Sequence, residues 1–178
     1  FNIKWDKMES YFIEVGKLDN PYDICKIMKK QGTRKYVYKI TYLGQNGMPN
    51  FTIKYGMSAD NSRNYGERTY RQIAHCKSWG NKRVKGSSGA EWLIIEEDIL
   101  NNYGIQIDHT RLVLEIIDLT HYPFMLQDEW LEVNKIESYY IKEYEKIYGQ
   151  KPIGNLNDEH NAHFRPFIKK TTLQTLFV

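Results

Sequence analysis

The sequence predicts an α+β domain in which a small three-stranded mixed sheet is flanked by helices. Three features predict it: two aromatic and β-branched runs on either side of residue 46, a third apolar run at 111–117, and a long helical pattern at 127–148. The 178 residues suit one domain with a sizeable core, with 41% hydrophobic and 26% charged residues. We therefore expect a single domain spanning residues 1–178.

The N-terminal half is expected to supply a helical extension and a β-hairpin. Residues 1–34 mix aromatics, acids and lysines and are expected to form one or two short helices. Tyr36–Leu43 and Phe51–Gly56 are rich in aromatic and β-branched residues, which is typical of strands. Glycine, asparagine and proline between these strands predict a long hairpin loop.

The C-terminal half is expected to alternate helices with one strand. A helical pattern at 68–79 is followed by a glycine- and serine-rich connection and by an acidic helix at about 90–102. The run at 111–117 is apolar enough to be a central strand. The long helix at 127–148 ends before a glycine and a proline, and an irregular tail at 158–178 follows the core.

Positive charge is concentrated between Arg63 and Lys85. This segment holds seven Lys or Arg residues and one acidic residue, so it carries +6 in a chain whose net charge is +3. Such a patch is typical of a surface that follows nucleic-acid phosphates, and a solvated helix face followed by a charged loop would give the same pattern. The residues expected to contact DNA are Arg63, Arg68, Lys77, Lys82, Arg83 and Lys85.

Glu137 interrupts the apolar stripe of the long helix. The stripe recurs at steps of three and four residues and consists of Leu126, Trp130, Val133, Tyr140, Tyr144 and Ile147. A carboxylate on a core-facing stripe is costly unless it is paired, hydrogen-bonded or bound to a cation. Glu137 is therefore a candidate metal ligand or catalytic acid, and a structural ion pair with an arginine is the alternative.

Two further pairs are candidates for site residues. Arg71 and His75 are four residues apart, so they share one face of the predicted helix and can address one phosphate. Tyr36 and Tyr38 alternate in phase and share one face of the first strand. Either pair also occurs in proteins for structural reasons alone.

Taken in order, these segments resemble the GIY-YIG nuclease family. That family has a strand with Gly-Ile-Tyr, a second strand with Tyr-Ile-Gly, a helix with an essential Arg, a third strand, a helix with an essential Glu, and a closing Leu-Asn. The corresponding segments are Tyr36-Val37-Tyr38-Lys39-Ile40, Lys54-Tyr55-Gly56-Met57-Ser58, Arg71-Gln72-Ile73-Ala74-His75, Glu137-Ser138-Tyr139-Tyr140-Ile141 and Gly154-Asn155-Leu156-Asn157. The resemblance covers about residues 35–157, with a helical insertion at about 86–104.

The chain departs from the family pattern in both half-motifs. Tyr36 replaces the first glycine, and alignment on Gly56 puts Lys54 where the family has its second tyrosine. A shift of one residue would offer Tyr55 instead. Neighbouring strand residues point to opposite faces, so only one of the two can serve, and the phase from Gly56 favours Lys54.

The resemblance implies hydrolysis of phosphodiester bonds in double-stranded DNA. Tyr38 would position and deprotonate the attacking water, and a nearby cation such as Lys54 would stabilise its phenolate, because tyrosine ordinarily ionises only near pH ~10. Arg71 would clamp the scissile phosphate, and His75 would assist proton transfer.

The resemblance also implies one Mg²⁺ or Mn²⁺ ion per active site and no small-molecule cofactor. Glu137 would hold the mostly hydrated ion. Either Asn155 or Asn157 would order the site, and the sequence leaves that choice open.

A type II restriction enzyme acting as a homodimer is the expected role, with Leu173–Val178 as a candidate dimer contact. The well-separated Cys25 and Cys76 form no CxxC pair, which favours an intracellular, cytoplasmic setting. The resemblance to a restriction enzyme implies a bacterial or phage source. No apolar run approaches the roughly 18 residues of a membrane span.

The alternatives to a restriction enzyme are a homing or repair nuclease, an inactive DNA-binding module of the same fold, and an HNH-like site at His160 and His163.

Overall fold

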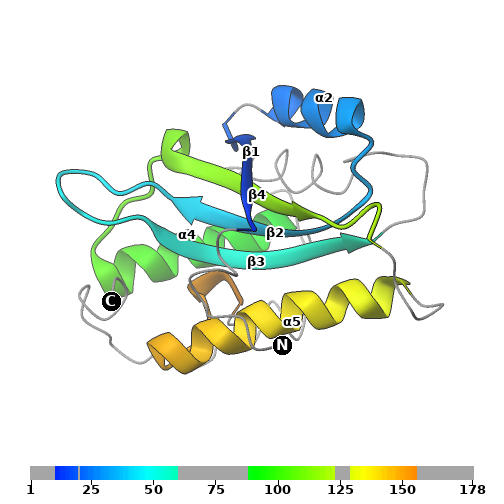
Figure 1. Ribbon diagram of the computed structural model, residues 1–178. Coiled ribbons are helices and arrows are strands. Elements are labelled where there is room, and N and C mark those ends of the chain that lie inside the picture. The colour runs from blue at the N-terminus through cyan, green and yellow to red at the C-terminus, as the bar shows by residue number, and fades with distance from the viewer. Residues whose placement is uncertain (1–10, 20, 60–87, 123–128, 156–178) are drawn as a thin grey trace.

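A four-stranded sheet with strand order β1-β4-β2-β3 forms the centre of the computed structural model (Figure 1). The structure describes residues 11–19, 21–59, 88–122 and 129–155. The described elements, in chain order, are β1 (Ile13–Lys17), α2 (Pro21–Gln31), β2 (Lys35–Tyr42), β3 (Phe51–Ala59), α4 (Ser88–Tyr103), η1 (His109–Arg111), β4 (Leu112–Asp118), α5 (Glu129–Tyr148) and η2 (Ile153–Asn155). The α+β class predicted from the sequence is confirmed. No helix within the described ranges is long and apolar enough to cross a membrane.

The sheet differs from the prediction in two respects. Over the described residues it has four strands instead of three, and each of the three pairings there is antiparallel and not mixed. The fourth strand is β1, which lies inside the segment that was expected to be helical. Ile13 pairs with Ile116 and Lys17 with Val113, so pairing with the apolar strand β4 determines its conformation.

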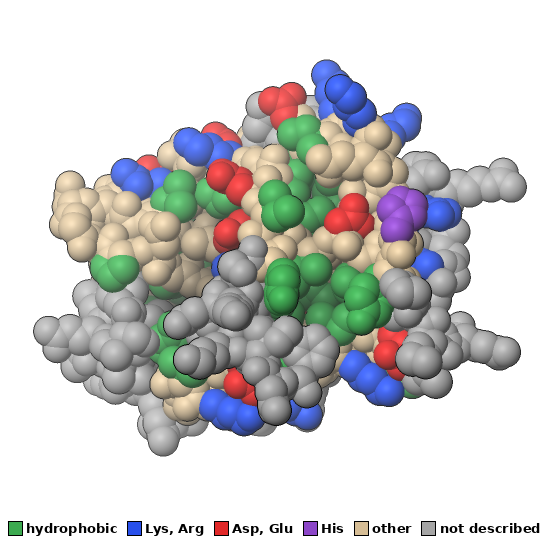
Figure 2. Space-filling view, in the orientation of Figure 1, with side chains coloured by type: hydrophobic (Ala, Val, Ile, Leu, Met, Phe, Trp, Pro, Cys, Tyr) green, Lys and Arg blue, Asp and Glu red, His purple; other side chains and the backbone are tan. Residues whose placement is uncertain are grey.

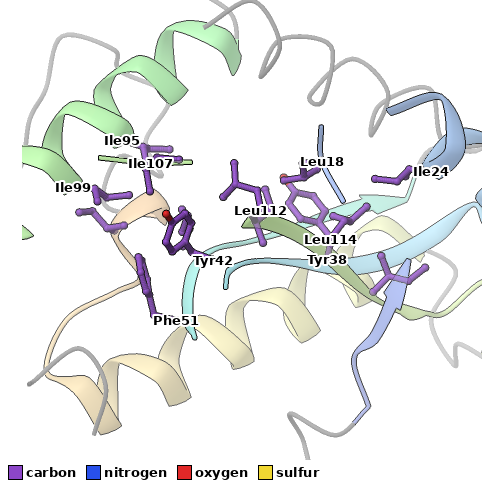
Figure 3. Close-up of a cluster of buried hydrophobic side chains, with 14 of the residues drawn as sticks. Leu18, Ile24, Tyr38, Tyr42, Phe51, Ile95, Ile99, Ile107, Leu112 and Leu114 are labelled. Carbon is purple, nitrogen blue, oxygen red and sulfur yellow. The ribbon is translucent and has the colours of Figure 1, made fainter. Parts of the chain in front are cut away.

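The two faces of the sheet are covered by different helices. Helices α2 and α4 pack on the face that carries the side chains of Tyr36, Tyr38 and Tyr42, as Figure 3 shows for Ile24, Ile95 and Ile99. Helix α5 packs on the other face, whose buried side chains include Val37, Tyr55 and Met57. We refer to these as the Tyr38 face and the Tyr55 face.

The long hairpin loop between β2 and β3 is fastened to the segment before β4. The Arg111 guanidinium donates to the carbonyl oxygens of Gly44 at 3.0 Å and Leu43 at 3.3 Å. Asp108 accepts hydrogen bonds from the backbone and the hydroxyl of Thr110, and these bonds lower the pKa of its carboxyl. The two hydrogen bonds from Arg111 satisfy loop carbonyls that would otherwise depend on water.

Helix α5 carries the predicted buried stripe, with one exception. Val133, Tyr140 and Tyr144 are buried against the Tyr55 face, as the three- and four-residue spacing predicts. The prediction is wrong for Ile147, which is 45% exposed, because Tyr148, four residues after Tyr144, packs against the buried cluster in its place. The predicted stripe residue Leu126 and the side chain of Trp130 lie outside the described part.

Candidate active site

Tyr38 lies directly across from Gly56 in the β2–β3 pairing, so the tyrosine and the glycine of the two half-motifs are cross-strand partners. A Cβ atom at position 56 would lie 2.5 Å from Cε1 of Tyr38 and closer still to Cζ and the phenol oxygen. The tyrosine ring therefore covers the backbone of Gly56. Tyr38 is 3% exposed, and its ring also contacts the Tyr36 ring, with 6.4 Å between the centroids.

Lys54 and Tyr55 lie on opposite faces of the sheet. Lys54 pairs with Ile40, which places it on the Tyr38 face, and its side chain is partly buried. Tyr55 is 1% exposed on the other face, where its ring stacks on Tyr140 at 5.8 Å between centroids. Of the two residues that could fill the family's second tyrosine position, Lys54 is therefore the one that shares a face with Tyr38. Its catalytic role remains a prediction.

Asn155 closes the outer edge of the sheet. Strand β3 is the last strand in the sheet, and Asn155 Oδ1 accepts from the Tyr55 backbone N–H while Asn155 Nδ2 donates to the Tyr55 carbonyl, both at 2.8 Å. The side chain thus replaces a neighbouring strand at this residue, and Asn155 is 1% exposed. Gly154 also lies close to β3, since a Cβ atom added to this glycine would lie 2.8 Å from Cβ of Lys54. These contacts fix the backbone on both sides of Lys54.

Glu137 lies in the middle of the buried stripe of α5 and is only partly buried. A carboxylate with this partial access to solvent suits a single, mostly hydrated divalent ion, which needs one or two protein ligands. Within the described residues, no group of three or more His, Cys, Asp or Glu side chains could hold a metal ion.

The structure does not bring Glu137 and Tyr38 onto one face. Helix α5 packs against the Tyr55 face, so Glu137 and Tyr38 approach the edge strand β3 from opposite sides. Any site that uses both must therefore extend around the β3 edge, where Asn155 lies. The remaining predicted site residues lie outside the described part of the chain: Arg71, His75, Asn157, Arg63, Arg68, Lys77, Lys82, Arg83, Lys85, and the His160 and His163 pair.

The sequence did not point to a polar cluster on the Tyr55 face. Lys39 is 8% exposed, and its ammonium lies 3.5 Å from Oε2 of Glu115 and 4.9 Å from the ring centroid of Phe12. The Thr41 hydroxyl donates to the same carboxylate oxygen at 2.5 Å. Lys39 and Glu115 are cross-strand partners. In the sequence, this cluster is indicated only by a lysine and a threonine at alternate positions of β2. Their shared partner, Glu115, becomes apparent only when the register between β2 and β4 is known.

The chain was also compared with known proteins. No protein-family model, no curated protein and no solved structure matches it.

Replacing Gly56 with alanine is expected to destabilise the fold by about 1–3 kcal/mol, because the new methyl group displaces the buried Tyr38 ring. Urea unfolding at equilibrium measures the change. Gly16→Ala is the matched control in another strand, since its Cβ would meet Ile24 Cγ1 at 3.2 Å, a contact that needs only a slight adjustment. Equal losses in the two variants would contradict the packing of Tyr38 on Gly56.

Proposed function

We propose that this protein is a divalent-metal-dependent endonuclease that hydrolyses phosphodiester bonds in double-stranded DNA. The observation that carries the proposal is the pairing of the two half-motifs, in which Tyr38 packs on Gly56 and shares its face with Lys54. A tyrosine and a lysine on one sheet face supply a proton acceptor and a cation that stabilises its phenolate. The ordered resemblance of five segments to the GIY-YIG nucleases supports the same activity.

In the proposed reaction, Lys54 stabilises the phenolate form of Tyr38. This phenolate orients the attacking water, accepts its proton and becomes a neutral phenol. Arg71 binds the scissile phosphate with its fork of donors, and His75 transfers a proton. Asn155 acts on the site indirectly, because it fixes the backbone between Lys54 and Gly56. Glu137 would hold Mg²⁺ or Mn²⁺, and the ion would supply neutralisation of charge on the phosphate and on the leaving 3′ oxygen.

The finer proposal is a sequence-specific type II restriction enzyme that cuts both strands as a homodimer. Sequencing the ends of digested DNA tests it, because a restriction enzyme gives one fixed cut site. Cuts that depend on DNA structure would indicate a repair enzyme instead. The replacement of the family's second tyrosine by Lys54 is the specific feature that favours the competing proposal, a DNA-binding module without activity.

Glu137→Ala is expected to lower plasmid nicking in Mg²⁺ at least about ten-fold, because the variant loses the proposed metal-binding carboxylate. Supercoiled plasmid is incubated with the full chain, and the nicked and linear products are resolved on a gel. Glu145→Ala is the matched control, since Glu145 is an exposed residue of the same helix. Absence of nicking by the unaltered chain, or equal nicking by Glu137→Ala, would contradict the proposal.

A further inference from the structure

The end of α2 and the start of β2 form a basic surface. Helix α2 carries Lys26, Lys29 and Lys30 at spacings of three and four residues, so these side chains share one face of the helix. All three are exposed, and they lie opposite the buried residues Ile24 and Met28. Figure 2 shows Lys and Arg side chains over α2 at the top of the molecule. None of the three lysines forms an ion pair with a carboxylate of the described residues.

The surface continues past the end of the helix through a fixed turn. Gly32 has φ +69° and ends α2, with the Thr33 backbone N–H bonded to the Met28 carbonyl and the Gly32 N–H to the Lys29 carbonyl. Arg34 and Lys35 follow, and the backbone N–H groups of both donate to the Thr120 hydroxyl oxygen, at 2.9 and 3.2 Å. The backbone that carries these charges is therefore held in one conformation.

Positive charge predominates on this part of the chain, and the acidic residue of α2 is Asp23 in its first turn. From Ile24 to Ala59 the sequence contains seven Lys or Arg residues and no Asp or Glu. Basic residues in the last turn stabilise the helix dipole, which would account for Lys29 and Lys30 but not for the others. By contrast, α5 on the other side of the sheet carries five Glu and three Lys.

The surface belongs to the same side of the sheet as Tyr38. Ile24 and Met28, which anchor α2, share a core with Tyr38. Lys35 pairs with Ala59, the last residue of β3, so the chain leaves the sheet for the basic segment 63–85 at the position where β2 begins. The two basic parts of the chain therefore start from one end of the sheet.

We infer that Lys26, Lys29, Lys30 and Arg34 form a phosphate-binding surface that engages duplex DNA next to the Tyr38 face. This inference rests on the proposed function and assigns DNA contacts outside the segment 63–85. Phosphate contacts position the duplex without reading its sequence. Each contact releases counterions, so binding through this surface weakens as the salt concentration rises.

The test measures binding of the full chain to a labelled duplex of roughly 30 base pairs, long enough to hold several phosphate contacts, in EDTA over a series of salt concentrations. Lys29→Gln combined with Lys30→Gln is expected to reduce the slope of log affinity against log salt by about 2, and to weaken binding at low salt by more than about ten-fold. Lys142→Gln combined with Lys146→Gln is the matched control, because both lysines are exposed on α5 and the change in charge is equal. This control is expected to retain the slope of the unaltered chain.

Equal slopes for the two double variants, or binding to phosphatidylserine vesicles without binding to DNA, would overturn the inference. Plasmid nicking is measured on the same preparations, so that failure of this inference can be distinguished from failure of the proposed function. A chain that nicks DNA with an unchanged slope in the α2 variant is a nuclease without this surface. A chain that does not nick but loses slope in the α2 variant retains the surface and lacks the proposed activity.

Discussion

Asn155→Ala is expected to lower the free energy of unfolding by about 2–5 kcal/mol. The substitution removes two hydrogen bonds and leaves the Tyr55 backbone N–H and carbonyl buried without partners, and each such group costs about 1–3 kcal/mol. It also leaves a small void at a residue that is 1% exposed. Equilibrium unfolding in urea measures the loss.

The matched control for this variant is Asn134→Ala. Asn134 lies on α5 beside the same strand, but its amide makes only a weak contact, 3.7 Å, with the Met57 sulfur. We expect this control to cost less than about 1 kcal/mol, in line with the small net contribution of weak hydrogen bonds. Similar losses in both variants would show that Asn155 does not close the β3 edge in the way its geometry indicates.

Tyr38→Phe is expected to reduce DNA cleavage by about 10²–10⁴-fold while the fold is retained. The change removes only the phenol oxygen, whose deprotonated form would accept the proton of the attacking water, a role whose loss typically has an effect of this size. The aromatic ring over Gly56 remains, so the packing described above is preserved. Initial rates of plasmid cleavage in Mg²⁺ and a urea unfolding curve measure the two effects separately.

Tyr36→Phe provides the control for this second prediction. Tyr36 lies two residues earlier on the same face of β2 and is 1% exposed, so the two variants lose the same group from equally buried positions. We expect the Tyr36 variant to cleave at nearly the rate of the unaltered chain. Parallel losses of cleavage in both variants would mean that the hydroxyls act through packing, and Tyr38 would no longer be a candidate proton acceptor.

The sequence predicted the elements whose side-chain patterns are strong. Strands β2 and β3 are rich in aromatic and β-branched residues, and α5 has a regular apolar stripe, so their positions followed from local sequence patterns. Strand β1 has no such pattern, since Ile13 is 70% exposed and Gly16 interrupts the strand. Its conformation depends on pairing with β4, a contact between distant parts of the chain that local patterns do not encode.

The candidate site was predictable to a similar extent. Strand alternation indicated that Lys54 and Tyr55 point to opposite faces, and the pairing with β2 shows which of them accompanies Tyr38. A helical stripe identifies the side of α5 that faces the sheet, but it does not identify the face of the sheet on which α5 packs. For this reason the placement of Glu137 and Tyr38 on opposite sides of β3 could not be inferred from the sequence.

The hydrogen bonds between Asn155 and Tyr55 join residues that are 100 positions apart in the chain, which has a consequence for biosynthesis. The β2–β3 hairpin is complete once Ala59 has been translated, whereas the amide that covers its outer strand is added much later. At roughly 5–20 residues per second, a ribosome needs about 5–20 s to reach Asn155 after Tyr55. During that interval the peptide groups of Tyr55 lack the amide that later covers them, and an uncovered strand edge can pair with other strands.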